Sequence, residues 1–292
     1  MTITIETFLN DLINDPTFTT CKQVLLPRFN ALDALKVRDM HRLLPYHTNL
    51  HPEDVAECLN IVRDRLLDGS LTYHTLYSDQ DIQKTPRKKD VGIFHFKAGL
   101  NAKFGIICPG GGFQYVGSIH EGFPFALALN KTGKTAFVLH YRTGSQLNAV
   151  EDLAAALTWI QSHRSKLEVD FEDYSLWGAS AGARMVALVD SYGTAYFGGQ
   201  ETPKAAAVIL AYTGHDDVFG NEAPTFAIVG DDDWIATPHL MKSRVDRLKA
   251  NGTPVEFKII LGAAHGFGLG RHTKAESWID EALRFWHRHI QK

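Results

Sequence analysis

A serine in this 292-residue chain has neighbours that would make its hydroxyl reactive. Ser180 is the centre of the sequence GASAG (178–182), which lies between an apolar run, 174–177, and a helical pattern. A serine between small residues on a sharp strand-to-helix turn has its oxygen lifted out of the sheet and towards substrate. The same pattern also occurs in tight turns with a passive serine. Ser180 is therefore a candidate nucleophile, and the rest of the sequence must decide whether it is reactive or passive.

Acidic side chains and a histidine follow two later apolar runs, which completes the chain order Ser, Asp, His. The run 226–230 leads into Asp231, Asp232 and Asp233, and the run 255–261 leads into His265. A histidine can take the serine proton and deliver it to the leaving group, while a carboxylate holds the imidazole tautomer. The three aspartates could instead bind a metal ion, but the chain has no acidic loop with calcium spacing. We therefore expect neither a metal nor a cofactor.

Three successive glycines follow the run 104–108, in the sequence PGGGF (109–113). Glycines let a backbone approach a ligand closely and expose its N–H groups. In serine hydrolases such a loop supplies part of the oxyanion hole, so we expect the N–H groups of Gly111 and Gly112, with that of Ala181, to hold an oxyanion. A phosphate-binding loop is the alternative, but the residues that follow, Phe113 to Tyr115, fit neither glycine-rich phosphate pattern.

The chain has 14 histidines, so one histidine carries little information by itself. His265 differs from the others because Gly266 and Gly268 follow it in a loop after a strand. His120, His140 and His215 could also lie near strand ends, and for these we expect an ordinary surface or core position.

Short apolar runs alternate with helical patterns from residue 104 onward. This alternation predicts a parallel sheet with helices on both faces, whose active site lies at the carboxyl ends of the strands. Helix starts are predicted at Asn148 with Glu151, at Thr237–Pro238 and at Thr273 with Glu276. The predicted strands are 104–108, 136–140, 174–177, 205–211, 226–229 and 255–261.

The first part of the chain has a different pattern. Residues 1–68 read as helical, and the clearest helix begins at Pro52 and ends before Gly69. Residues 71–77 and 92–96 read as an antiparallel strand pair joined by a polar surface loop, 78–90. We therefore divide the chain into an N-terminal helical cap or oligomerisation segment, 1–70, and a catalytic domain, 71–292.

Composition narrows the class of protein. The net charge is −3, so there is no basic excess to neutralise the phosphates of a nucleic acid. The three cysteines are far apart, which excludes a disulfide framework and fits a reducing compartment. The N-terminus lacks the pattern of a secretory signal, and no apolar run reaches the about 18 residues that span a bilayer. We expect a cytoplasmic protein that binds neither nucleic acid nor membrane.

Four segments resemble those of α/β-hydrolase-fold serine esterases: 106–118, 175–185, 226–236 and 265–270. The chain is similar to the hormone-sensitive-lipase-like and acetyl-esterase group, which includes acetyl xylan esterases and feruloyl-esterase-like hydrolases, over about two thirds of its length. The resemblance implies a triad of Ser180, His265 and Asp233, with Asp232 as the alternative acid. Pro109 stands where the lipase branch has histidine, which favours the acetyl-esterase branch.

The resemblance also implies the substrate, a small-molecule ester with a short acyl chain, acetyl above all, and it allows an acetylated sugar and a homo-oligomer. Phe113, Tyr115 and Trp234 are bulky rings that could shorten the acyl pocket or stack on a sugar, although core packing would explain them equally well. We therefore expect a serine carboxylesterase. A serine peptidase or amidase on the same fold is the first alternative, and a non-catalytic binding protein is the second.

Overall fold

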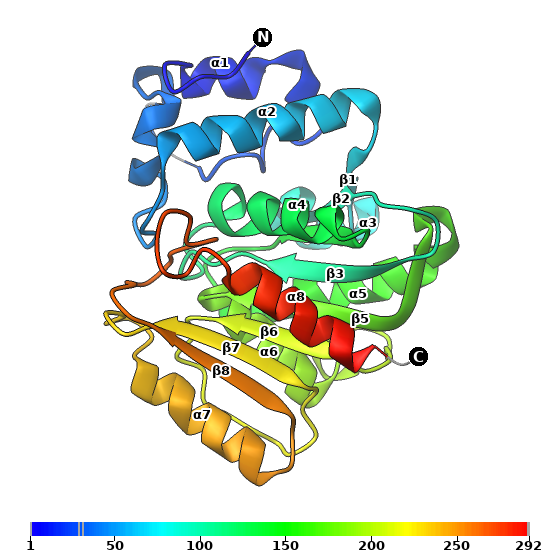
Figure 1. Ribbon diagram of the computed structural model, residues 1–292. Helices are drawn as coiled ribbons and strands as arrows, with labels where there is room; N and C mark the ends of the chain where they lie inside the picture. Colours follow the sequence, from blue (N-terminus) through cyan, green and yellow to red (C-terminus); the bar gives the residue numbers. More distant parts are fainter. Residues whose placement is uncertain (1, 29, 31, 291–292) are drawn as a thin grey trace.

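The computed structural model describes residues 2–28, 30 and 32–290, and its centre is an eight-stranded sheet. The strand order is β1-β2-β4-β3-β5-β6-β7-β8 (Figure 1). The pairs β1–β2 and β2–β4 are antiparallel and the other pairs are parallel, which confirms the predicted mostly parallel sheet. The strands are β1 (Leu71–Thr75), β2 (Gly92–Phe96), β3 (Ala102–Cys108), β4 (Thr135–His140), β5 (Val169–Ala179), β6 (Ala207–Ala211), β7 (Thr225–Gly230) and β8 (Val255–Ile260).

Helices cover both faces of the sheet, as the continuous apolar strands require. Helices α4 (Phe123–Lys131) and α8 (Trp278–His289) contact each other on one face, and α5 (Gln146–Leu167) and α6 (Ala181–Tyr192) contact each other on the opposite face (Figure 1). Helix α7 (Pro238–Ala250) packs on β7 and β8. The carboxyl ends of the parallel strands are thereby left to carry the loops that matter for chemistry.

Two predicted helix starts were wrong. Helix α5 begins at Gln146, because the side chain of Ser145 accepts the N–H of Asn148 and caps the helix earlier than predicted. The last helix begins at Trp278 rather than behind Thr273, because the Thr273 hydroxyl donates to the Gly270 carbonyl in a preceding turn. In both places several polar residues could cap a helix, and tertiary packing selects one of them.

The charged segment 78–90 is more ordered than a surface loop. It contains α3 (Asp79–Lys84), which Ser78 and Asp81 close with a reciprocal capping box, and a 3₁₀ helix (Pro86–Asp90). The flanking strands β1 and β2 do pair antiparallel, as predicted.

The described residues of the N-terminal segment, 2–28, 30 and 32–70, form α1 (Leu9–Asn14), three 3₁₀ helices (Pro16–Phe18, Leu32–Ala34 and Val37–Arg42) and α2 (Pro52–Asp68). Helix α2 packs on α4, and the segment lies on that side of the sheet (Figure 1). Its buried side chains belong to the same hydrophobic core as those of the sheet. Its role as a cap or a subunit contact, and the homo-oligomer itself, stay predictions.

All three cysteines are buried free thiols. Burial raises the pKa of Cys21 and of Cys58 to about 12, so both stay protonated and inert at neutral pH. Within the described residues, the helices are too short or too polar for any of them to cross a bilayer.

Buried histidines should make the fold sensitive to mild acid. Burial lowers the pKa of His95 to about 3 and that of His120, His140 and His215 to about 4, from an ordinary 6.5. Below pH 6.5 these four histidines therefore bind more protons in the unfolded chain than in the folded chain, so their contribution to the free energy of unfolding falls as the pH drops towards 4. Each histidine contributes about 1 kcal/mol per pH unit to this slope.

Urea denaturation between about pH 7 and about pH 5 measures the slope. The His95→Phe variant is the matched control, because neither ring nitrogen of His95 has a hydrogen-bond partner among the described residues and the ring stacks on Phe137. Its slope should be shallower than that of the parent protein, and an equal slope would contradict this account.

Candidate active site

The turn between β5 and α6 holds Ser180 in a strained conformation. Its φ is 52° and its ψ is −118°, a region that residues other than glycine rarely occupy. The Ser180 N–H donates to the Ala211 carbonyl of β6 at 2.9 Å, and a Cβ added at Gly182 would lie 1.8 Å from the Cys108 carbonyl oxygen. Only glycine fits at position 182, and the resulting tight turn presents the half-buried serine at the carboxyl end of β5.

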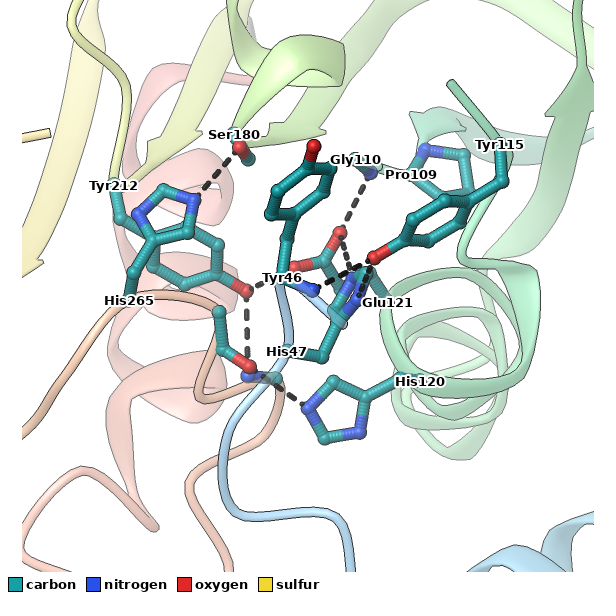
Figure 2. A network of polar contacts seen from close by, with 12 residues as sticks. Tyr46, His47, Pro109, Gly110, Tyr115, His120, Glu121, Ser180, Tyr212 and His265 are labelled. Atoms are coloured by element: carbon teal, nitrogen blue, oxygen red, sulfur yellow. Dashed lines mark hydrogen bonds and ion pairs between the residues drawn. The ribbon is translucent and has the colours of Figure 1, made fainter. Parts of the chain in front are cut away.

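Ser180, His265 and Asp233 form a continuous hydrogen-bonded chain. Ser180 Oγ lies 2.8 Å from His265 Nε2, and His265 Nδ1 lies 2.8 Å from Asp233 Oδ2 (Figure 2 shows Ser180 and His265). Asp233 Oδ1 accepts the N–H groups of Ile235 and Ala236 at 2.9 and 2.7 Å. His265 and Asp233 are 4% and 2% exposed. The carboxylate is held firmly enough to keep the proton on Nδ1 and to leave Nε2 as the base.

The structure distinguishes the three consecutive aspartates. Asp231 accepts the N–H of Gly262 at 2.6 Å, and the N–H of Asp232 donates to the Ala263 carbonyl at 3.1 Å. Both side chains are exposed, whereas Asp233 is buried against His265. Asp233, rather than the alternative Asp232, therefore bonds the histidine.

The glycine loop lies directly beside the serine. A Cβ added at Gly110 would lie 2.8 Å from the Cβ of Ser180. Gly111 and Gly112 have φ values of 132° and 59°, and their N–H groups donate to no other group in the described part of the chain. The N–H of Ala181 lies at the first turn of α6, where the helix dipole favours negative charge. The glycine loop and the first turn of α6 thus both lie next to Ser180, and the role of these three N–H groups as oxyanion donors stays a prediction.

The three predicted pocket rings lie in different surroundings. Trp234 is 80% exposed on the loop that carries Asp233. Phe113 packs edge-on against Tyr141 at a ring distance of 6.4 Å, and Tyr115 stacks on Tyr46 at 5.9 Å. Phe113 and Tyr115 are half-buried next to the glycine loop. A role for each of the three in binding substrate stays a prediction.

The stretch before α2 contacts the catalytic loops, which the sequence did not reveal. The Thr48 N–H donates to the Gly266 carbonyl at 3.0 Å, and the Thr48 hydroxyl donates to the His265 carbonyl at 2.8 Å. The ring of Tyr46 lies against Gly112, with Cε2 3.0 Å from the place of an added Cβ. Residues far apart in the chain thus form one wall of the site.

Glu121 is the second feature that the sequence analysis missed. Its side chain is fully buried, and its carboxylate accepts the N–H of Gly110 at 2.6 Å and the hydroxyl of Tyr212 at 2.8 Å (Figure 2). Its position between Ile119 and the apolar side chains of Phe123 and Phe125 was the available signal, because a charge buried among such side chains needs partners. His120, beside it, lies 3.0 Å through Nε2 from the Gly266 carbonyl oxygen, while His215 is buried after β6.

Residues 189–292 match the prolyl oligopeptidase family, a stretch that includes Asp233 and His265 but not Ser180. No curated protein sequence matches the chain. Among solved structures, the carboxylesterase Cest-2923 from Lactobacillus plantarum is 22% identical, with a TM-score of 0.61 over 69% of this chain and 94% of that one.

Two further solved structures are similar over nearly their whole length. The acetyl ester-xyloside bifunctional hydrolase from Caldicellulosiruptor lactoaceticus is 19% identical, with a TM-score of 0.65 over 74% of this chain and 96% of that one. The propionate-bound esterase Est2 from Thermogutta terrifontis is 18% identical, with a TM-score of 0.64 over 75% of this chain and 94% of that one. The chain has the α/β-hydrolase fold. This confirms the fold that the four motifs implied.

The tight turn between β5 and α6 leads to a prediction about the stability of a Gly182 variant. Gly182→Ala forces the new methyl group into the Cys108 carbonyl and should lower the free energy of unfolding by about 3 kcal/mol or more. Gly99→Ala is the matched control, because an added Cβ at Gly99 has nothing within 4 Å, and it should change stability by no more than about 0.5 kcal/mol. Urea denaturation measures both variants, and equal midpoints would contradict the steric explanation.

Proposed function

We propose that the protein is a serine carboxylesterase that hydrolyses small esters with short acyl chains. The observation that carries the proposal is the pair of 2.8 Å hydrogen bonds from Ser180 to His265 and from His265 to Asp233. A serine, a histidine and a buried carboxylate in this order can activate an otherwise weak nucleophile at neutral pH. The esterases among the similar structures support the same chemistry.

The first half of the reaction makes an acyl-enzyme. His265 Nε2 takes the proton as Ser180 Oγ attacks the ester carbonyl, and Asp233 stabilises the imidazolium that forms. The N–H groups of Gly111, Gly112 and Ala181 would hold the negative oxygen of the tetrahedral intermediate. His265 then gives its proton to the leaving alcohol, and the carbon–oxygen bond of the ester breaks.

The second half repeats these steps with water in place of the serine. His265 takes a proton from water, the hydroxide attacks the acyl carbonyl, and the proton returns to Ser180 as the acid leaves. The same three N–H groups hold the second intermediate. Each step uses groups of this chain and water.

Acetyl and other short acyl groups are the proposed substrates. Tyr46, Phe113 and Tyr115 crowd the glycine loop with rings, which leaves less room for a long acyl chain. Similar structures include an acetyl ester-xyloside hydrolase and an esterase with bound propionate or butyrate. An acetylated sugar is the proposed class of natural ester, because rings at the mouth of a site can stack on a sugar.

Hydrolysis of amides is the second candidate. The match of residues 189–292 to the prolyl oligopeptidase family favours it, because that stretch carries Asp233 and His265. The triad is the same, and only the leaving group differs. Matched p-nitrophenyl ester and p-nitroanilide substrates with the same acyl group discriminate between the two: faster turnover of the anilide would make the protein an amidase or peptidase.

Removal of the serine oxygen should abolish turnover. Ser180→Ala is expected to lower kcat on p-nitrophenyl acetate at least about 10⁴-fold, because only the oxyanion donors and binding remain. The measurement is hydrolysis of p-nitrophenyl esters from acetate to octanoate by both proteins, with the parent peaking at acetate or butyrate. Near-normal hydrolysis by the variant would overturn the nucleophile, and a peak at octanoate would overturn the short acyl chain.

The neighbouring aspartates provide a matched pair of variants. Asp233→Asn should lower kcat about 10⁴-fold, because the amide favours the wrong imidazole tautomer. Asp232→Asn should leave kcat within about twofold, since that side chain is exposed and makes no contact with His265 in the described structure. Steady-state kinetics on p-nitrophenyl acetate decide, and equal losses in the two variants would contradict the assignment of Asp233.

A further inference from the structure

One buried carboxylate joins three segments that are distant in the sequence. Glu121 Oε2 accepts the N–H of Gly110 at 2.6 Å and lies 3.1 Å from Nε2 of His47, while Oε1 accepts the hydroxyl of Tyr212 at 2.8 Å (Figure 2). Gly110 belongs to the glycine loop, Tyr212 follows β6, and His47 belongs to the N-terminal segment. The side chains of Glu121 and His47 are 0% and 2% exposed.

We propose that Glu121 is a positioning residue for the reaction, and that His47 fastens the N-terminal segment to it, so that this segment is a working part of the active site. The proposal rests on the proposed function, because it assigns Glu121 the task of holding the oxyanion loop and the loop of the catalytic base in register. Glu121 itself touches neither the ester nor the reacting atoms.

The first step of the argument concerns the glycine loop. Gly110 immediately precedes the expected oxyanion donors, and its N–H is bound to a carboxylate, which makes a strong charge-assisted hydrogen bond. Gly111 and Gly112 occupy φ values of 132° and 59°. Glycine adopts such values without strain but equally adopts many others, so contacts with neighbouring groups must select this conformation. The bond from Gly110 to Glu121 is therefore a fixed point from which the two following N–H groups are aimed.

The second step concerns the base. The Tyr212 hydroxyl, which donates to Glu121, accepts the N–H of Gly268 at 3.2 Å. The Tyr212 ring also packs edge-on against the His265 ring at 5.2 Å. The carboxylate that holds the oxyanion loop thus also orients, through Tyr212, the loop and the ring of the histidine. Both halves of the catalytic machinery share one anchor.

The third step concerns the partner of the carboxylate. Burial by itself would raise the pKa of Glu121, but the facing His47 and the hydrogen bonds from His47 and Tyr212, with His120 nearby, lower that pKa to about 2. Glu121 is therefore ionised at any working pH. A buried carboxylate that loses a partner is strongly unfavourable, so His47 is needed to keep Glu121 in place.

The N-terminal segment is bound to the same loops at further points. His47 Nδ1 lies 2.9 Å from the Tyr115 hydroxyl, which also accepts the N–H of Tyr46 at 3.1 Å. Thr48 donates to the carbonyls of His265 and Gly266. Residues 46–48 thus contact the glycine loop, the carboxylate and the histidine loop in turn.

The experiment compares kcat, KM and stability of Glu121→Gln and Glu121→Ala with those of the parent protein on p-nitrophenyl acetate. The expected loss in kcat is about 10²-fold for Glu121→Ala and smaller for Glu121→Gln, with KM within about threefold, because misplaced oxyanion donors affect the transition state more than substrate binding. Asp190→Asn is the matched control: Asp190 is also buried and accepts a backbone N–H, that of Ala223, away from the site. It should lower Tm with kcat unchanged.

His47 variants test the link to the N-terminal segment. His47→Gln can still place an N–H near Glu121 and should retain most of kcat, whereas His47→Leu cannot and should lose about as much as Glu121→Gln. Equal kcat in the two His47 variants, or kcat in folded Glu121→Gln and Glu121→Ala no lower than in Asp190→Asn, would overturn the proposal.

Hydrogen–deuterium exchange separates this inference from the proposed function. In Glu121→Gln and His47→Leu the peptides that cover residues 44–50 and 109–117 should exchange faster than in the parent, while a peptide from β8 should not change. If the parent protein neither hydrolyses esters nor reacts with a fluorophosphonate, the proposed function fails. Exchange alone then decides: unchanged exchange in both peptides overturns the link, and faster exchange supports it.

Discussion

The close approach of α6 to the end of β3 is the constraint on which the site depends. Gly182 lies so near the Cys108 carbonyl that no side chain fits between them, and Ser180, two residues earlier, has a positive φ. Cys108 is also paired with Gly178 across the parallel strands β3 and β5. The glycine loop after β3 and the serine after β5 must therefore emerge side by side. A nucleophile and its oxyanion donors meet because two neighbouring strands end together.

His265 reaches Ser180 by a longer route, because β8 is three strands away from β5 in the sheet. The loop that carries it has positive φ at Gly266 and Gly268, so its course is not set by regular structure. Bonds from outside the loop fix it instead: Thr48 donates to the His265 carbonyl, and the Trp278 indole N–H donates to the Gly268 carbonyl at 3.0 Å. The position of His265, the catalytic base, is thus determined by tertiary contacts rather than by local structure.

Local structure places Ser180, whereas tertiary contacts place His265, and this contrast explains which features the sequence could predict. Apolar runs and turn residues are local features of the sequence. They predict the strands, the mostly parallel direction of these strands and the strand-to-helix turn around Ser180. The start of α5 was misjudged because Ser145 and Asn148 are both good caps, and packing decides between them. The contacts of His47 and Glu121 were not predicted, because they join residues of three separate segments and a single sequence carries no record of which distant groups meet.

The buried charge at Glu121 can be compared with an apolar side chain of similar size at the same position. A leucine there would leave the Gly110 N–H and the Tyr212 hydroxyl without their acceptor in a buried region, which is unfavourable for each group. It would also leave Nε2 of His47, a buried side chain, without its carboxylate partner. The carboxylate satisfies all three groups at once. An ion in the core is therefore consistent with a stable fold, since it replaces three separate unsatisfied groups with one closed network.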